Sequence, residues 1–232
     1  MTRSDDLLAG LDAVRERIRV ACEAAGRSPE DLTLIAISKT WPASDVALVH
    51  AHGLRDFGEN KDQEASAKAA DLAGSGGLRW HFIGQLQTNK ARSVATYADV
   101  VHVLDRPKLA RALSAGAEQA GRTLEVLVQV SLDGDPTRGG VRADGALGLA
   151  DLAAGLPHLV VTGVMGVAPR EADPRAAFDT LVGIGASIRV GHPAATVVSA
   201  GMSGDLEAAV AAGATHLRVG TALFGHRPPL LR

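Results

Sequence analysis

The sequence lacks the features that mark secreted, membrane-bound or nucleic-acid-binding proteins. Its single cysteine, Cys22, cannot form an internal disulfide and fits a reducing compartment. Residues 1–19 are charged throughout, without the apolar stretch of a secretory signal, and no later apolar run is long enough to span a bilayer. The formal net charge is only −2, with acids and bases interspersed. We therefore expect a cytoplasmic globular protein without a membrane or nucleic-acid partner.

Motifs that define several enzyme classes are also missing. The eight histidines have no metal-binding spacing such as HExxH, so we expect no metal site. There is no GxSxG elbow, Walker loop or GxGxxG fingerprint. Any chemistry must therefore come from another arrangement of residues.

Short apolar runs rich in branched residues alternate with helical segments along the whole chain. Strict strand–helix alternation predicts a parallel sheet with helical crossovers. Eight such units favour an α/β fold, a single (β/α)8 TIM-type barrel over residues 1–232, with a flavodoxin-like open sheet as the alternative. The predicted strands are 32–38, 55–58, 80–84, 100–104, 124–131, 159–166, 196–200 and 216–220.

Two segments fall outside the alternation. Residues 5–25 have the period of an amphipathic helix ending at Gly26, and we expect this extra N-terminal helix to cover one end of the barrel. Residues 131–145 are rich in glycine and include Pro136. We interpret them as a mobile loop after the fifth strand, not as a domain boundary.

Lys39 is the most informative residue of the chain. It follows the run 32–38, which is typical of a strand buried on both faces, and it is the only one of five lysines predicted to end a core strand. A lysine placed there would lose hydration, which favours the neutral amine that forms Schiff bases. The structural alternative is a strand-end lysine that reaches water or pairs with an acid.

Two turns of small residues follow the seventh and eighth predicted strands, where barrels commonly bind phosphate. The first contains Ser203 and Gly204, and the second contains Gly220 and Thr221. Glycine lets a ligand approach the backbone, and hydroxyl groups add donors. Either turn alone could simply begin a helix. Two of them on adjacent strands indicate a phosphate site.

Three further side chains are expected near this end of the barrel. By strand alternation Arg218 should point into the barrel mouth, where its guanidinium needs an acceptor from a ligand or from an interior acid such as Glu59. Asn60 should lie beside Lys39. His81 either contacts the ligand or is a satisfied core residue.

Lys39, Arg218 and the two turns together describe a ligand with an aldehyde, a phosphate and a third acceptor. Pyridoxal 5′-phosphate (PLP) has all three, the last being its ring nitrogen. The chemistry of the candidate residues therefore points to PLP.

From about residue 7 to residue 227 the chain resembles the pyridoxal phosphate homeostasis proteins, the YggS-like family. The resemblance implies a barrel related to the N-terminal domain of alanine racemase, with PLP bound as a Schiff base to Lys39 and Arg218 at the pyridine nitrogen. It also implies that both turns hold the phosphate and that Asn60 lines the site. The matching motifs are Ala36-Ile37-Ser38-Lys39-Thr40, Phe57-Gly58-Glu59-Asn60, Trp80-His81-Phe82-Ile83-Gly84, Gly201-Met202-Ser203 and Arg218-Val219-Gly220-Thr221.

The related racemases need a base on each face of the substrate carbon, and take the second from a tyrosine in another domain. The only tyrosine here, Tyr97, is expected far from the barrel mouth, and we expect no second domain. A protonated Arg218 would also keep the ring nitrogen unprotonated and weaken the cofactor as an electron sink.

We therefore expect a carrier or buffer of PLP that contributes to intracellular vitamin B6 and amino-acid homeostasis. It would have no catalytic residues and act as a monomer, with PLP-dependent apoenzymes as candidate partners. A PLP-dependent amino-acid racemase is the alternative. From the residues alone, a Schiff-base aldolase acting on a phosphorylated sugar is a third hypothesis.

Overall fold

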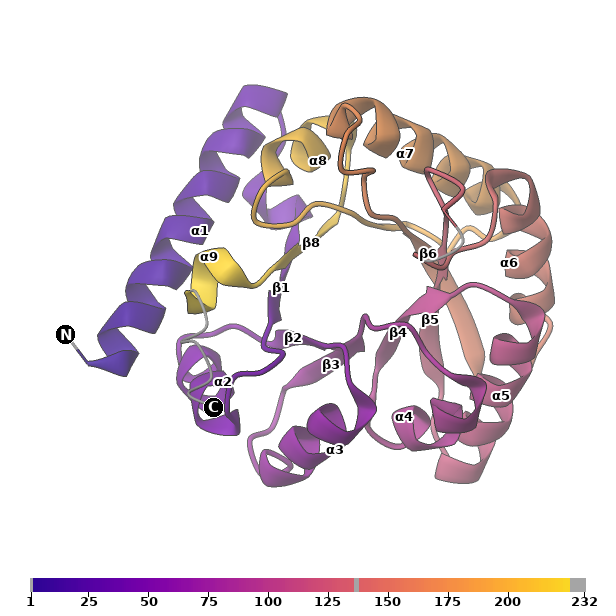
Figure 1. The fold of residues 1–232 in the computed structure, drawn as a ribbon, viewed down its shortest axis with the longest axis horizontal. Helices are drawn as coiled ribbons and strands as arrows, with labels where there is room; N and C mark the ends of the chain where they lie inside the picture. The colour runs from indigo at the N-terminus through magenta and orange to yellow at the C-terminus, as the bar shows by residue number, and fades with distance from the viewer. Residues whose placement is uncertain (1, 136–137, 226–232) are drawn as a thin grey trace.

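The structure is a computed structural model that describes residues 2–135 and 138–225. Its parallel strands close into a barrel in sequence order, with helices around the outside (Figure 1). The predicted (β/α)8 barrel is thus confirmed, and the open sheet is excluded. The strands are β1 (Thr33–Ile37), β2 (Asp56–Glu59), β3 (Arg79–Phe82), β4 (Val100–Leu104), β5 (Leu124–Gln129), β6 (Leu159–Met165), β7 (Val197–Ser199) and β8 (His216–Val219).

The helices follow the strands as the sequence pattern predicts. Pro107 at the first turn and Gly121 in the left-handed conformation bound one of them, as helix-start and helix-stop signals require. The helices are α1 (Arg3–Ala25), α2 (Ala43–Ala51), α3 (Asp62–Asp71), α4 (Ala91–Tyr97), α5 (Pro107–Ala120), α6 (Ala146–Ala154), α7 (Pro174–Gly191), α8 (Leu206–Ala212) and α9 (Thr221–Phe224), with 3-10 turns η1 (Pro29–Asp31), η2 (Thr88–Lys90) and η3 (Ala143–Gly145).

The N-terminal helix α1 exists as predicted, but the expectation that it covers one end of the barrel is wrong. It lies in the outer ring, where it packs against α8, α9 and α2 (Figure 1). The reason is that α9, which follows β8, is only one turn long, so α1 takes the place in the outer ring that a longer helix there would fill. The packing is close at Gly10, where an added Cβ would lie 2.3 Å from the Leu223 carbonyl oxygen.

Much of the barrel interior is polar. The side chains of His81, His102, Ser199 and Arg218 are buried there. The bond between His102 of β4 and Ser199 of β7 joins strands that are not neighbours in the sheet, so it crosses the barrel interior. In the loop after β5, Val130 bridges Val141, and residues 136–137 lie outside the described residues. Among the described helices, none combines the length and apolarity needed to cross a membrane.

Candidate functional site

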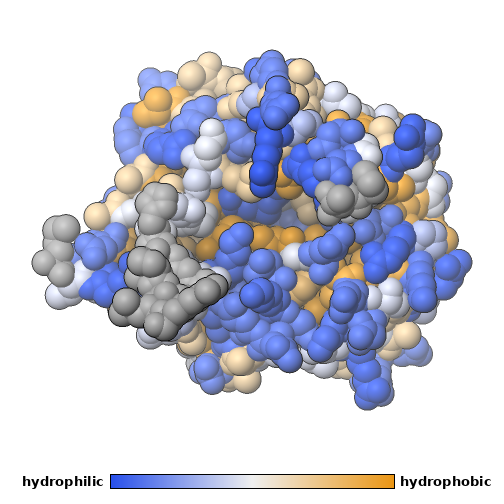
Figure 2. All heavy atoms as spheres, in the orientation of Figure 1, coloured by the Kyte–Doolittle hydropathy of each residue, from blue (hydrophilic) through white to orange (hydrophobic). Residues whose placement is uncertain are grey.

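A cavity of about 390 Å³ opens where the strands of the barrel end. In the space-filling view, hydrophilic side chains surround the hollowed mouth and hydrophobic atoms show between them (Figure 2). The cavity brings together six of the eight residues expected from the sequence, but not Asn60 or His81. It is lined by Ile37, Lys39, Thr40, Trp41, Ile83, Met202, Ser203, Gly204, Arg218, Gly220, Thr221 and Gly225.

Lys39 lies two residues beyond β1, at the edge of this cavity. The expectation that burial strips its ammonium of water is wrong, because the side chain is exposed. The strand ends at Ile37, and the following turn carries Lys39 out to the surface. Its availability to a ligand therefore comes from exposure, not from desolvation.

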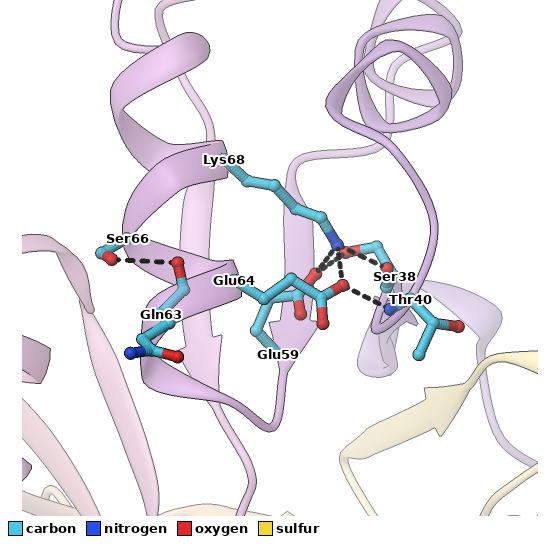
Figure 3. A network of polar contacts seen from close by, with 7 residues as sticks. All are labelled: Ser38, Thr40, Glu59, Gln63, Glu64, Ser66 and Lys68. Carbon is cyan, nitrogen blue, oxygen red and sulfur yellow. Dashed lines mark hydrogen bonds and ion pairs between the residues drawn. The ribbon is translucent and has the colours of Figure 1, made fainter.

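The residue after Lys39 holds an unusual backbone conformation. Thr40 has φ 72°, in the left-handed region that β-branched residues rarely adopt. The Glu64 carboxylate accepts a hydrogen bond from the Thr40 amide (Figure 3). Such strain persists only where neighbouring structure supports it, so Glu64 fixes the turn that presents Lys39.

Glu64 belongs to a buried ionic cluster centred on Lys68, which reaches down from α3 (Figure 3). The Lys68 ammonium lies 2.6 Å from Glu59 Oε1 and 2.7 Å from Glu64 Oε1, and donates to the Ser38 carbonyl at 2.7 Å. The Ser38 hydroxyl donates to the same Glu59 oxygen at 2.7 Å. Burial raises the pKa of Glu59, and Lys68 opposes that shift. Glu59 is thus engaged here, and the suggestion that it pairs with Arg218 is wrong.

The turns after β7 and β8 are tied to each other and to α1. The Ser203 hydroxyl accepts from the Ala222 amide at 3.3 Å, which joins the two turns. Arg17 of α1 donates to the Ser203 carbonyl at 3.0 Å. The Asp205 carboxylate accepts from the Met202 amide at 2.6 Å. The backbone amides of Ser203 and Gly204 have no acceptor among the described residues, so these donors are available to a ligand.

Arg218 points into the barrel, as strand alternation predicts, and only 4% of it is exposed. Its guanidinium donates to the Ser199 hydroxyl at 2.6 Å and to the Gly166 carbonyl at 2.9 Å. Burial lowers the pKa of Arg218 to about 10, with Asp205 acting in the opposite direction. The side chain therefore stays positively charged at neutral pH beside the cavity.

Asn60 and His81 lie outside this cavity. Asn60 lines a neighbouring one with Gln85 and Lys90, and its backbone is so close to Gly84 that a Cβ there would lie 2.0 Å from the Asn60 carbonyl oxygen. His81 is buried inside the barrel, bonded to Asp56 and His102. In this structure His81 is therefore a core residue with hydrogen-bond partners and does not line the cavity.

Several features of the site had little signal in the sequence. Lys68, which the sequence does not predict to end a core strand, is the lysine that the structure buries. Its spacing of four residues from Glu64 was a signal for an ion pair, but not for burial. Trp41, stacked on Phe224 and under Arg3, lines the cavity mouth without any motif to mark it. No group of three or more potential metal ligands occurs within residues 2–135 and 138–225.

The buried histidines make stability depend on pH. Burial lowers the pKa of His216 from 6.5 to about 4, and lowers that of His102 well below its ordinary value. The unfolded chain takes up protons first, so this stabilisation is complete above pH 6.5 and is lost as pH falls. Between pH 6.5 and about pH 5, His216 alone should reduce the free energy of unfolding by about 2 kcal/mol.

Urea unfolding across this pH range measures the effect. His216→Gln should flatten the dependence, whereas His52→Gln, at an exposed position, should leave it unchanged. Equal slopes in wild type and His216→Gln would contradict the assignment.

Comparison with known families gives one match over most of the chain. Residues 10–228 match the model of the alanine racemase N-terminal domain. A pyridoxal phosphate homeostasis protein of Mycobacterium tuberculosis H37Rv is 42% identical, over 97% of this chain and 94% of the relative. The protein of the same name from Escherichia coli K12 is 38% identical, over 96% of this chain and 97% of the relative.

Solved structures agree with these matches. PipY of Synechococcus elongatus PCC7942, with PLP bound, is 34% identical and covers 94% of this chain and 100% of its own, with a TM-score of 0.82. Alanine racemase of Clostridium difficile 630 shares the fold, with a TM-score of 0.74 at 13% identity. It matches 97% of this chain but only 58% of the racemase.

Proposed function

This chain belongs to the family of pyridoxal phosphate homeostasis proteins, and from that membership we propose that it binds PLP between Lys39 and Arg218 and carries or buffers it without substantial turnover. The observation that supports this most is the cavity itself, which combines an exposed amine, a buried permanent cation and a pair of hydroxyl-bearing turns. PLP presents an aldehyde, a ring nitrogen and a phosphate to match them.

The groups that line the cavity are of the kinds that would hold PLP. A volume of about 390 Å³ lies within the usual range of ligand pockets. Gly220 lines the cavity against Ile37, and a Cβ there would lie 3.3 Å from the Ile37 carbonyl oxygen. The free amides of Ser203 and Gly204, with the Thr221 hydroxyl, supply donors suited to a phosphate. These residues would hold the phosphate.

Capture of PLP would be covalent. Lys39 would hold the cofactor through its amine, the aldehyde would supply the electrophilic carbon, and forming the C=N bond would release one water molecule. When bound in an enzyme, PLP supplies an electron sink for carbanions. Arg218 limits that use, because a charged donor at the ring nitrogen keeps the nitrogen unprotonated. The site would therefore hold PLP more readily than it would activate it.

Among the described residues that line the cavity, none is a tyrosine that could serve the racemase alternative as second base. Tyr97, the only tyrosine of the chain, contacts Asp62 between α3 and α4 at 3.4 Å and does not line the cavity. Burial further raises the pKa of its hydroxyl. The remaining hypothesis is a Schiff-base aldolase, which would contain no PLP and would purify colourless. The visible spectrum of the purified protein separates it from a PLP carrier.

Exchange of the α-hydrogen of amino acids for deuterium tests the absence of turnover. The PLP-loaded protein should exchange alanine and other common amino acids no faster than free PLP does. Turnover in the usual enzymatic range of about 1–10³ s⁻¹ would overturn the carrier function and require a base that the cavity does not show.

The phosphate should dominate reversible affinity. Oriented donors meet a dianion with charge-assisted hydrogen bonds, which are stronger than neutral ones, and pyridoxal lacks that group. Ser203→Ala combined with Thr221→Ala should therefore weaken binding of PLP more than binding of pyridoxal. Equilibrium titration of both ligands measures this, with Ser187→Ala on the exposed side of α7 as control. Equal losses of affinity for the two ligands would show that the two turns do not bind the phosphate.

We place the protein in the cytoplasm as a single-domain monomer that exchanges PLP with PLP-dependent apoenzymes. The lone cysteine, Cys22, supports a reducing compartment, and it is buried on α1. Light scattering of the purified protein, with and without PLP, measures the oligomeric state.

A further inference from the structure

A continuous line of hydrogen bonds crosses the barrel interior from Arg218 to Asp56. The Arg218 guanidinium lies 2.6 Å from the Ser199 hydroxyl, which lies 3.1 Å from His102 Nδ1. His102 Nε2 lies 2.8 Å from His81 Nδ1, and His81 Nε2 lies 2.9 Å from the Asp56 carboxylate. Five strands contribute residues to this line. The predicted contacts with the ligand do not account for it.

The direction of every bond in the line follows from its two ends. Arg218 can only donate, so the Ser199 oxygen accepts from it and the Ser199 hydrogen is free to go to His102 Nδ1. A neutral His102 then carries its hydrogen on Nε2 and donates to His81 Nδ1. His81 carries its hydrogen on Nε2 and donates to Asp56. With both rings neutral, each group donates toward the carboxylate.

The line connects two regions of different solvent access. Arg218, Ser199, His102 and His81 are all buried. Asp56, the first residue of β2, lies at the amino-terminal mouth of the barrel, and 21% of its side chain is exposed. Arg79 lies 4.0 Å from Asp56 and 2.6 Å from Glu125 at the same mouth. The line thus begins at the candidate cavity and ends at the opposite opening.

We infer that Ser199, His102, His81 and Asp56 are positioning residues that orient the Arg218 guanidinium from the far side of the barrel. Ser199 and the Gly166 carbonyl fix two of its nitrogens. His102 accepts from the Ser199 hydroxyl, which directs the Ser199 hydrogen away from Arg218 and leaves the oxygen to accept from the guanidinium. The consequence for PLP rests on the proposed function: the contact at the ring nitrogen would be set partly by a carboxylate outside the binding site.

The charged and titratable groups facing His102 agree with a neutral ring at that position. His102 faces His81, Arg218, His216 and Arg79, and all of them disfavour a second positive charge there. The Asp56 carboxylate is the one anion at the end of the line, where it accepts from His81.

The first test needs no cofactor. Nuclear magnetic resonance of the apoprotein labelled with ¹⁵N-histidine reports which ring nitrogen carries hydrogen. At neutral pH both His81 and His102 should be in the Nε2–H tautomer. In Asp56→Ala, which removes the acceptor of His81 Nε2–H, both rings should lose this single tautomer. A Nδ1–H tautomer or a protonated ring at either position in the wild type would overturn the inferred direction.

The second test measures coupling to the cavity from its remote end. Asp56→Asn keeps an oxygen that accepts from His81, whereas Asp56→Ala removes it. Loss of one such hydrogen bond should weaken PLP binding about threefold to tenfold in Asp56→Ala, and Asp56→Asn should restore most of it. The absorption band of bound PLP should shift in Asp56→Ala, since it reports the contact at the ring nitrogen.

A matched control separates positioning from loss of stability. Ser114→Ala removes a buried serine hydroxyl that donates to Pro157 on the outer layer at 2.8 Å, and should leave PLP affinity unchanged. If Ser199→Ala and Asp56→Ala bind PLP as tightly as Ser114→Ala does, the inference is wrong. If the wild type binds no PLP, the proposed function fails instead, and the tautomers still decide whether the line exists.

Discussion

Lys39→Ala should abolish covalent capture of PLP while leaving the fold intact. Lys39 is the only lysine that lines the cavity within the described part of the chain. No other amine is therefore placed to form the C=N bond. The side chain is exposed, and a surface substitution of this kind usually changes the free energy of unfolding by no more than about 0.5 kcal/mol.

Absorbance titration with PLP, followed by urea unfolding of the same samples, measures both expectations. The variant should show no protein-bound visible band, with reversible binding through the phosphate remaining. Lys61→Ala is the matched control, because Lys61 is also exposed but lines the neighbouring cavity. A band of wild-type intensity in Lys39→Ala would show that another residue captures the aldehyde.

Lys68→Met should destabilise the protein more than any other single lysine substitution. It would leave the Glu59 carboxylate, only 1% exposed, with the Ser38 hydroxyl as its only donor among the described residues and with Oε2 unpaired there. Breaking one side of a buried ion pair usually costs about 3–5 kcal/mol. It should also release Glu64 from its place on the Thr40 amide, and so slow covalent capture at Lys39.

Urea unfolding and the rate of PLP capture measure these two effects. The double variant Lys68→Met with Glu59→Gln should recover much of the lost stability, because the uncompensated charge is gone. Lys90→Met is the control, since Lys90 lies 3.8 Å from Asp62 and is half exposed, where a pair contributes at most about 1 kcal/mol. Equal destabilisation by Lys68→Met and Lys90→Met would contradict the assigned role.

The sequence predicts this fold well because its signals are local and repeated. Each of the eight strands appears as an apolar run, and each is offset from its predicted limits by at most two residues. Strand alternation also places Arg218 toward the interior correctly. The position of α1 could not be predicted, because it depends on the shortness of α9 and on the outer surface which that helix leaves uncovered.

The sequence predicts which residues gather at the cavity better than it predicts which of them are buried. Lys39 lies at the cavity, but it is exposed, and the buried lysine is Lys68. Sequence patterns cannot show this, because a helical lysine at the spacing of a surface ion pair gives the same signal whether its helix faces solvent or the barrel. The line through His102 and Ser199 was missed for a similar reason, since strands that are distant in the chain meet only inside the closed barrel.

Reduction of the purified, PLP-loaded protein with borohydride, followed by peptide mass mapping, tests the central claim most directly. Reduction fixes a C=N bond as a stable pyridoxyl adduct on the lysine that formed it. The account predicts one adduct, on the peptide that contains Lys39. An adduct mainly on Lys61, Lys68 or Lys90, or none at all, would contradict it.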